Sequence, residues 1–258
     1  MPAVRARKRF GQHFLHDPSV IRRIVAAIAP EPGQRVLEIG PGRGAITRGL
    51  IAAGATLTAV EIDRDLAAAL ENEYGDRLDL ITGDVLDLTL ANLGQPLRVV
   101  GNLPYNISTP VLFHLFDQLD CVETMVFMLQ REVADRLAAL PNNKTYGRLT
   151  VSAQLRCDIR SLFTVPSGAF TPPPAVVSSV VSLTPRPDRP GQATFRALDG
   201  LLTQAFGKRR KTLTNALAGC LDTADLEALE IDASLRPENL APEDFLRCAH
   251  RYIEKGTA

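Results

Sequence analysis

The stretch Val99–Thr109, VVGNLPYNIST, places Asn102, Pro104 and Tyr105 directly after an apolar run that is typical of a β-strand. The side-chain oxygen of Asn102 and the carbonyl oxygen of Leu103 could accept the two N–H bonds of an amine. An amine on a nucleobase is a poor nucleophile because its lone pair is delocalised into the ring. Two acceptors would favour the tetrahedral geometry of its transition state. The stretch therefore predicts a site that activates an exocyclic amine.

Two aromatic residues could hold the ring that carries such an amine. Pro104 fixes the backbone so that the Leu103 carbonyl points into the pocket. Tyr105 offers a flat face on which a base can stack, a contact worth roughly 1–3 kcal/mol. A base must leave its stack to enter such a pocket. Phe170, in the Pro-rich run GAFTPPP, is the candidate for the second face of a sandwich, although a phenylalanine is more often part of a core.

A second group of residues predicts a nucleoside-containing cofactor. Gly40, Gly42 and Gly44 follow a predicted strand in RVLEIGPGRGAIT and open a helix. Glycines allow a tight turn and a close approach of a ligand to the backbone. The next strand ends in VEID, which places Glu61 21 residues beyond Gly40, with Ile62 beside it. A carboxylate at that position can accept both hydroxyls of a ribose.

Residues around this loop favour S-adenosylmethionine over NAD. Glu38 would place a carboxylate beside the loop, which is unfavourable next to a pyrophosphate and favourable near a sulfonium cation. The following strand ends in ITGDVLDL, where Asp84 could accept from the amino group of an adenine while the backbone of Val85 pairs with the ring. Gly40–Ala45 also satisfies the loose dinucleotide fingerprint, so NAD stays an alternative. Glu61 and Asp84 could instead only cap helices.

The segment GQHFLHDPSV precedes the first of these strands and contains His13 and His16. No third ligand with suitable spacing follows, so we predict no metal site. We expect the segment to fold over the cofactor, with Gln12 and Leu15 closing that side. The cysteines contain no C-x-x-C pair, which argues against a zinc site and against a disulfide framework. They are Cys121, Cys157, Cys220 and Cys248.

The composition of the 258 residues, 45% hydrophobic and 22% charged, is that of an ordinary globular protein. No apolar run approaches the roughly 20 residues of a membrane helix, and the basic N-terminus lacks the apolar run of a secretory signal. We therefore predict a cytoplasmic protein. The net charge is zero, but two basic runs could contact phosphates, unless they are a solvated arm and a helix terminus. They are Arg5, Arg7, Lys8 and Arg9 near the N-terminus, and Lys208–Lys211.

Residues 18 to about 130 alternate between helix-like and strand-like segments. Near-continuous apolar strands between helices predict a parallel sheet covered on both faces, which is the Rossmann-like, doubly wound α/β fold. Ligands bind such sheets at the carboxyl ends of the strands. The predicted strands are Arg35–Ile39, Thr56–Val60, Leu78–Thr82, Leu97–Gly101 and Thr124–Leu129, and the predicted helices include Pro18–Ala29, Ala45–Ala53 and Leu66–Tyr74.

The remainder of the chain predicts an extension of this domain and then a helical tail. The predicted elements of the extension are helices at Arg131–Leu140 and Leu149–Arg156 and strands at Ile159–Phe163 and Val176–Leu183. TPRPDRPGQ is rich in proline and charge and lacks apolar periodicity, so we place a domain boundary there. We expect a catalytic domain over residues 1–187 and a small, all-helical C-terminal domain over residues 188–258.

Seven motifs carry a resemblance that spans nearly the whole chain. In order, they are GQHFL, VLEIGPGRGAIT, VEID, GDVL, NLPYNIS, AFTPPP and FGKRRKTL. This ordered set resembles the KsgA family of ribosomal RNA adenine dimethyltransferases. The resemblance implies an S-adenosylmethionine-dependent methyltransferase fold. It also implies transfer of methyl groups to N6 of two adjacent adenines in a hairpin near the 3′ end of 16S ribosomal RNA, with a role in small-subunit biogenesis.

The resemblance also implies roles for individual residues. Tyr105 and Phe170 would hold the adenine, and the helical tail would help to grip the small subunit. The family commonly has Asn where His13 stands, and a Lys and an Asp where Ala175–Val177 follow the proline run. The residues implied to line the cofactor and amine site are His13, Leu15, Gly40, Glu61, Asp84 and Asn102.

Two other functions stay open at this point. An Erm-type methyltransferase, which acts on large-subunit RNA, is the nearest alternative, and NLPYNIS with the basic GKRRK run favours the small-subunit branch. A non-catalytic RNA-binding assembly factor with the same fold is the other, and the intact glycine loop and Asn102 argue against it. We expect a monomer whose partner is 16S ribosomal RNA within the small subunit or its precursor, and which binds no membrane.

Overall fold

The computed structural model describes residue 7 and residues 11–256, which divide into two compact units. The first unit contains the described residues up to Ala134, together with Arg160–Pro185. The second contains Asp135–Ile159 and the chain from Arg186 onward. Each unit has an apolar cluster within it, and each is described separately below.

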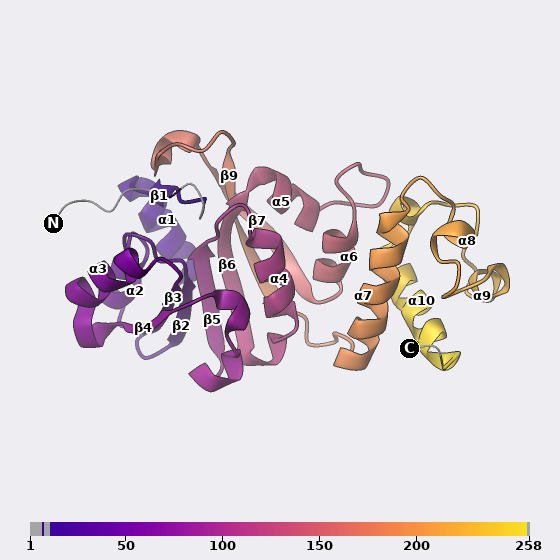
Figure 1. Ribbon diagram of the computed structural model, residues 1–258, viewed down its shortest axis with the longest axis horizontal. Coiled ribbons are helices and arrows are strands. Elements are labelled where there is room, and N and C mark those ends of the chain that lie inside the picture. Colours follow the sequence, from indigo (N-terminus) through magenta and orange to yellow (C-terminus); the bar gives the residue numbers. More distant parts are fainter. Residues whose placement is uncertain (1–6, 8–10, 257–258) are drawn as a thin grey trace. The chain divides into compact units, whose positions relative to one another are not determined.

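The first unit is built on strands and helices that alternate along the chain (Figure 1). Its helices are α1 (Pro18–Ile28), α2 (Thr47–Ala52), α3 (Arg64–Tyr74) and α4 (Ser108–Phe116). Its strands are β1 (Phe14–Leu15), β2 (Arg35–Ile39), β3 (Thr56–Glu61), β4 (Asp79–Thr82), β5 (Leu97–Asn102), β6 (Val122–Gln130), β8 (Phe170–Thr171) and β9 (Ser178–Pro185). The division between the units falls within helix α5 (Arg131–Leu137) and strand β7 (Cys157–Val165).

The central sheet has the strand order β4-β3-β2-β5-β6-β9-β7. Strands β2 to β6 pair in parallel, and β9 adds to β6 in the antiparallel direction. This confirms the predicted doubly wound α/β fold. Because the order reverses on either side of β2, the carboxyl ends of β2 and β5 flank a topological switch point, where ligands of such sheets bind.

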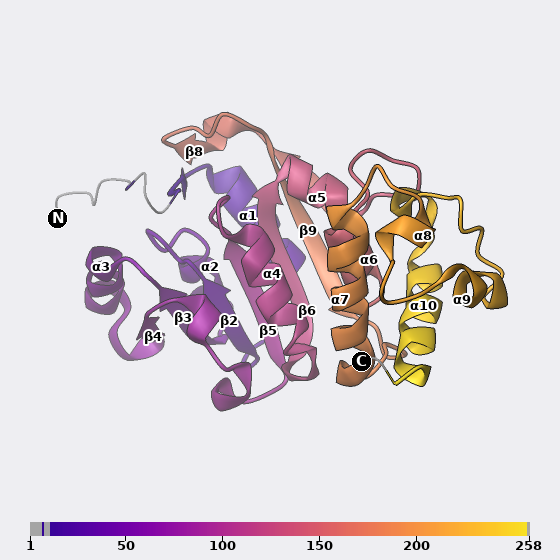
Figure 2. The same ribbon diagram turned by 45° about the vertical axis from the view of Figure 1, so that its right-hand side comes forward.

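Both faces of the sheet are covered, which explains why its strands are apolar at successive positions. One face contributes Val36, Ala59 and Val100 to an apolar cluster with residues of α1, α2 and α3. The alternate residues of these strands, whose side chains point to the other face of the sheet, are also fully buried, as Leu37 and Val99 show. Helix α4 lies in front of β5 and β6 in both Figure 1 and Figure 2.

The register of the two central strands fixes how the two predicted motifs meet. Ile39 of β2 lies opposite Gly101 of β5. A Cβ atom added to Gly101 would lie 2.5 Å from the Ile39 carbonyl oxygen, so only glycine fits without a shift of one strand. The residues that follow this pair are Gly40, which opens the glycine loop, and Asn102, which opens the NLPY stretch.

A short ribbon and a capped helix hold the segment before the main sheet. β1 pairs with β8 in the antiparallel direction, with Phe14 opposite Thr171 and Leu15 opposite Phe170. Helix α1 follows because the Asp17 side chain accepts from the backbone N–H groups of Ser19 and Val20, at 2.8 and 3.1 Å. We call Gly11–Leu15 the strap, because it is fixed to a loop that lies far away in the sequence.

The second unit is helical. Its helices are α6 (Arg148–Gln154), α7 (Gln192–Gly207), α8 (Leu213–Ala216), α9 (Thr223–Ala228) and α10 (Pro242–Glu254). Leu198 of α7 and Phe245 of α10 belong to its apolar cluster, as do Tyr146 and Val151. Inside it, the buried Arg156 guanidinium donates to Asp199 at 2.7 Å.

The segment Asp135–Ile159 therefore groups with the tail, whereas the sequence analysis assigned it to the catalytic domain. Its apolar residues pack against α7 and α10, a choice of partner that helical periodicity alone does not reveal. The division after Pro185 lies close to the expected boundary after residue 187.

Candidate active site

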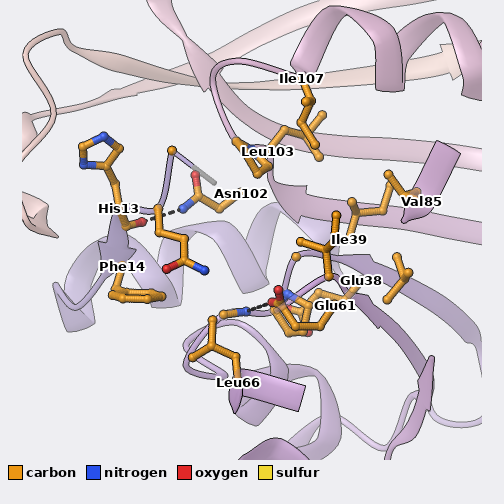
Figure 3. Close-up of a pocket in the computed structure, with 18 of the residues that line it drawn as sticks. His13, Phe14, Glu38, Ile39, Glu61, Leu66, Val85, Asn102, Leu103 and Ile107 are labelled. Atoms are coloured by element: carbon orange, nitrogen blue, oxygen red, sulfur yellow. Dashed lines mark hydrogen bonds between the residues drawn. The ribbon is translucent and has the colours of Figure 1, made fainter. Parts of the chain in front are cut away.

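A cavity of about 270 Å³ opens at the carboxyl ends of the central strands in the first unit. It brings together the glycine loop, the strap and the NLPY stretch, as Figure 3 shows for part of the lining. It is lined by all but one of the predicted site residues: His13, Leu15, Gly40, Gly42, Glu61, Ile62, Asp84, Val85, Asn102, Leu103, Pro104 and Tyr105.

We divide the cavity into two halves. The cofactor half comprises Glu38, the Gly40–Gly44 loop, Glu61 and Asp84, at the ends of β2, β3 and β4. The acceptor half comprises His13, Asn102, Leu103, Pro104 and Tyr105, from the strap and the end of β5.

The glycine loop meets the carboxylate that the sequence placed at the end of β3. Gly42 has a φ of +59°, and a Cβ there would lie 3.3 Å from the Phe14 ring. Its backbone N–H donates to Glu61 Oε2 at 3.0 Å (Figure 3). The N–H of Asp63 donates to Glu61 Oε1 at 2.9 Å. Each carboxylate oxygen retains a second lone pair, so Glu61 can still accept from a ligand.

Glu61 is only 4% exposed, and burial raises its pKa above the ordinary value. The two backbone N–H donors oppose this shift, because they stabilise the charged form. The carboxylate is thus held in one orientation by the loop that it faces. This arrangement suits the recognition of a pair of hydroxyl groups.

Glu38 is the more perturbed acid of this half. It is 1% exposed, and its Oε2 accepts from the Thr47 hydroxyl at 2.7 Å. Burial raises its pKa from 4.5 to about 7, with a smaller upward contribution from the charge of Glu61. A buried carboxyl that titrates near neutrality gains most from a nearby cation, because the cation favours its charged form.

The ends of β3 and β4 are tied together beside these acids. The Gly83 N–H donates to the Glu61 carbonyl at 3.0 Å. Asp84 accepts from the Leu86 N–H at 3.0 Å and so caps a short 3-10 turn, and Val85 is buried next to it. Asp84 therefore does cap a turn while it also lines the cavity. Ile62 lines the same cavity and is 43% exposed.

The strap, through Gln12, and Arg7 before it both make polar contacts to Asp63, beside the cofactor half. The Gln12 side chain donates to Asp63 at 3.1 Å, and the Arg7 guanidinium donates to Asp63 at 2.8 Å. Arg7 also pairs with Asp65. This residue of the predicted basic arm thus has carboxylate partners within the protein, while Arg5, Lys8 and Arg9 lie outside the described residues.

Asn102 is oriented by the strap. Its Nδ2 donates to the His13 backbone carbonyl at 3.1 Å, and because a carbonyl only accepts, this contact fixes which end of the amide is nitrogen (Figure 3). Among the described residues, no donor contacts Asn102 Oδ1. The half-buried amide thus presents an acceptor to the cavity.

Tyr105 follows in a tight turn, in which the Ile107 N–H donates to the Pro104 carbonyl at 3.1 Å. The Tyr105 hydroxyl and the Ser178 hydroxyl are 2.6 Å apart and share a hydrogen bond. Burial raises the pKa of Tyr105 above its ordinary value. The His13 imidazole stacks on the Tyr105 ring, with centroids 5.4 Å apart and planes inclined at 27°.

Phe170 is placed differently from the prediction. It is 2% exposed, belongs to the apolar cluster of the first unit, and is not among the residues that line the cavity. The reason is its pairing with Leu15 in the β1–β8 ribbon, which turns its side chain into the core. In this structure Phe170 offers no face to a base, and the ring that stacks on Tyr105 is His13.

Sequence reasoning missed Ser178 and Pro172, which fix Tyr105 and His13. His13 Nδ1–H donates to the Pro172 carbonyl at 2.8 Å. The signal in the sequence is indirect: both residues lie within the AFTPPPAVVSS run, residues 169–179, whose prolines point only to a rigid position for Phe170. A contact between segments this far apart depends on the pairing of β1 with β8, and a two-residue strand has no recognisable pattern.

Further features bear on the other predictions. The four cysteines are free thiols, and burial raises the pKa of Cys157 and of Cys248 to about 12. Within residue 7 and residues 11–256, no group of three His, Cys, Asp or Glu side chains could hold a metal ion. In the same part of the chain, no helix has the length and apolarity needed to cross a membrane.

These observations define a class of protein. The parallel sheet carries a glycine loop after β2, a carboxylate that can bind a ribose at the end of β3, and a buried acid that would favour a nearby cation. This combination is typical of the cofactor domain of an S-adenosylmethionine-dependent methyltransferase. The residues present fit that cofactor, because a Cβ at Gly42 would fill the space between the loop and the Phe14 ring and because Glu61 retains free lone pairs.

Comparison with known proteins gives the family. The family model described as ribosomal RNA adenine dimethylase matches residues 3–254. The chain is 52% identical to the ribosomal RNA small subunit methyltransferase A of Chromobacterium violaceum, with 97% of each chain covered. It is 49% identical to the protein of the same name from Pseudomonas aeruginosa, covering 97% of this chain and 96% of that one.

Solved structures agree with this result. A dimethyladenosine transferase from Plasmodium falciparum is similar with a TM-score of 0.79 and 26% identity, covering 95% of this chain and 98% of that one. The 23S ribosomal RNA methyltransferase ErmE, at 24% identity and a TM-score of 0.69, covering 93% of this chain and 99% of that one, shares the fold. The chain belongs to the ribosomal RNA adenine dimethylase family. It is an S-adenosylmethionine-dependent methyltransferase of adenine in ribosomal RNA.

Proposed function

We propose that this protein transfers methyl groups to N6 of two adjacent adenines in the 3′-terminal hairpin of 16S ribosomal RNA, within the small subunit or its precursor. The observation that carries the proposal is the orientation of Asn102, a residue of the cavity lining whose Nδ2 donates to the His13 carbonyl, so that Oδ1 is left to accept from a ligand. The names of relatives that are about half identical over nearly their full length support the small subunit as the target.

In the acceptor half, Asn102 and Leu103 act on the amine. The Asn102 side-chain oxygen and the Leu103 carbonyl each accept one N–H bond of N6, which draws the lone pair out of conjugation and towards the methyl group. Pro104 sets the direction of that carbonyl. Tyr105 holds the ring by stacking, and Ser178 holds the Tyr105 hydroxyl.

In the cofactor half, the chain holds and orients the methyl donor. Glu61 accepts the ribose hydroxyls, with Ile62 next to it, and Asp84 and Val85 contact the adenine ring of the cofactor. Gly40 and Gly42 allow its close approach, and Leu15 of the strap closes one side of the cavity. S-adenosylmethionine supplies a methyl group already activated by a positive sulfur, so no cysteine or histidine nucleophile is needed.

The test is a labelling assay with S-adenosylmethionine carrying a labelled methyl group. The purified protein is incubated with unmethylated small subunits, with large subunits and with naked 16S RNA, and the labelled nucleoside is identified after digestion. We expect dimethyladenosine in the small subunit. Label found only in the large subunit would replace this proposal with an Erm-type function, and binding of small subunits without label would favour an assembly factor.

The remaining proposals concern partners and place. In the second unit, Arg209 is paired with Glu238 at 3.1 Å, while Lys208, Arg210 and Lys211 are exposed. We infer that these three contact RNA phosphates. We also infer a monomer that acts in the cytoplasm, where ribosomal RNA is found. Sedimentation of the free protein tests whether it is a monomer, and fractionation of cells tests whether it is cytoplasmic.

A further inference from the structure

The ring face of Tyr105 that faces the strap is covered. The His13 imidazole stacks on it with a centroid separation of 5.4 Å. Aromatic pairs stack at centroid separations of roughly 4.5–7 Å, so a base stacked on the same face of Tyr105 would occupy the volume that His13 now fills.

The imidazole is held in this position from two sides. Its Nδ1–H donates to the Pro172 carbonyl at 2.8 Å, and the backbone carbonyl of His13 accepts from Asn102 at 3.1 Å. The next residue, Phe14, pairs with Thr171 in the ribbon. The position of the imidazole therefore follows from the fold of the strap, and the same strap orients the amide that accepts from the amine.

No other aromatic ring competes for this role in the described part of the cavity. Phe170 is 2% exposed in the core and cannot reach Tyr105 without unpacking the ribbon. Phe14 also lines the cavity, but Arg43 lies over its ring at 4.3 Å. His13 is thus the ring that occupies this face of Tyr105, where a base would stack.

We propose that the His13 imidazole is a placeholder for the target adenine, covering the stacking face of Tyr105 in the free protein and leaving it when the flipped adenine enters. The proposal rests on the proposed function. An entering base must replace both the His13 stack and the bond to Pro172, and only a base with an exocyclic amine gains the Asn102 acceptor in return. His13 therefore raises the cost of entry for every base, and the Asn102 acceptor offsets that cost only for a base that carries an exocyclic amine.

The first test is the KM for small subunits at saturating S-adenosylmethionine. If His13 competes with the base, then His13→Ala and His13→Asn both lower the KM, by about two- to tenfold, because either variant removes the stacked ring. The matched control is His16→Ala, since His16 is an exposed histidine of the same segment, and its KM should equal that of the wild type.

A purely structural role gives the opposite pattern. If His13 only anchors the strap through Pro172, His13→Ala raises the KM and His13→Asn, which can still donate to that carbonyl, restores it. That result would overturn the proposal, as would an unchanged KM in both variants. Because the wild type is assayed alongside, failure of the proposed function is seen separately, as a wild-type protein that does not label the small subunit.

The second test observes the ring directly. The chain has four histidines, so their imidazole C–H signals can be resolved by NMR, and the His13→Asn variant assigns the signal of His13. Stacking on Tyr105 predicts a ring-current shift of that signal in the free protein. We expect the shift to persist with S-adenosylmethionine alone and to disappear when an RNA hairpin with the unmethylated adenines is added. A shift that persists with bound RNA contradicts displacement.

Discussion

The two buried acids of the cofactor half, Glu38 and Glu61, are held by residues close to them in sequence, whereas Asn102 and Tyr105 of the acceptor half are held by distant segments. Glu38 and Thr47 are 9 residues apart, and Glu61 and Gly42 are 19 residues apart. In contrast, Asn102 and His13 are separated by 89 residues, and Tyr105 and Ser178 by 73. The two halves should therefore respond differently to substitution.

The two halves differ in which contacts fix the positions of their functional groups. The backbone N–H groups of Gly42, in the glycine loop, and of Asp63, just after β3, hold the Glu61 carboxylate, and these residues belong to a single β-α-β unit. The acceptor half depends on the strap, so Asn102, His13 and the Pro172 loop form one chain of contacts. A defect in the acceptor half should reduce turnover, while a defect in the cofactor half should reduce cofactor affinity.

The largest effect is expected for Asn102→Ala, which removes one of the two acceptors of the amine. We expect methylation of small subunits to fall by about 100-fold or more, the scale of losing one preorganised group that stabilises the transition state. Binding of the subunit should stay close to wild type. Asn92→Ala, at an exposed position, is the control. Unchanged methylation in Asn102→Ala would show that Asn102 does not act on the amine.

The next effect is expected for Glu61→Ala, which breaks the cofactor half. It removes the ribose acceptor and leaves the N–H groups of Gly42 and Asp63 without their carboxylate. Calorimetry should show an S-adenosylmethionine Kd raised about 10- to 100-fold, as for loss of hydrogen bonds to a charged group. Glu71→Ala, on the exposed side of α3, should leave the Kd unchanged. A Kd as tight as wild type in Glu61→Ala would contradict the ribose role.

A smaller effect, which also depends on pH, is expected at Glu38. Its pKa is about 7 in the fold and 4.5 for the ordinary group, so between these values the folded state holds a proton that the unfolded state has released. Stability should therefore fall as the pH rises from about 4.5 to 7. Glu38→Gln removes this contribution. The melting temperature of the variant minus that of the wild type should therefore increase as the pH rises from about 4.5 to 7.

The same acid predicts a pH dependence of cofactor affinity. Above about pH 7 the Glu38 carboxylate is charged, so affinity for the cationic S-adenosylmethionine should rise by about three- to tenfold between pH 6 and 8. S-adenosylhomocysteine, which lacks the positive sulfur, should show no such rise, and neither should Glu38→Gln with the cationic ligand. An equal rise for both ligands would assign the effect to another group.

The smallest effect is expected for Ser178→Ala in the acceptor half. It removes the partner of the Tyr105 hydroxyl but leaves the ring and Asn102 in place. Methylation should fall by about two- to tenfold, the range of a single neutral hydrogen bond. Ser179→Ala is the matched control, because Ser179 is a buried serine at the next position of β9. Equal losses in both variants would indicate damage to β9 rather than a role for the hydroxyl.

The same contrast explains what could be predicted from the sequence. Strand β2 has the predicted bounds, and Glu61 and Asp84 lie where the ends of β3 and β4 were expected, because strand length and chain order fix these positions. Phe170 and Pro172 could not be placed, since both depend on how the strap pairs with a loop far away in the sequence. Ser178 could not be placed either, since its partner Tyr105 is 73 residues away. Proximity in sequence made the cofactor half predictable.

Gly101 has a consequence for the distance over which the methyl group travels. Because it lets β5 lie against β2 at ordinary ladder spacing, the loop that holds the donor and the amide that holds the acceptor begin on adjacent strands, roughly 4.8 Å apart. The separation between the residues that hold the methyl donor and those that hold the acceptor is thus set by the spacing of hydrogen-bonded strands. Substitutions in the loops can change which base binds, but a larger separation of donor and acceptor would require breaking the pairing of β2 with β5.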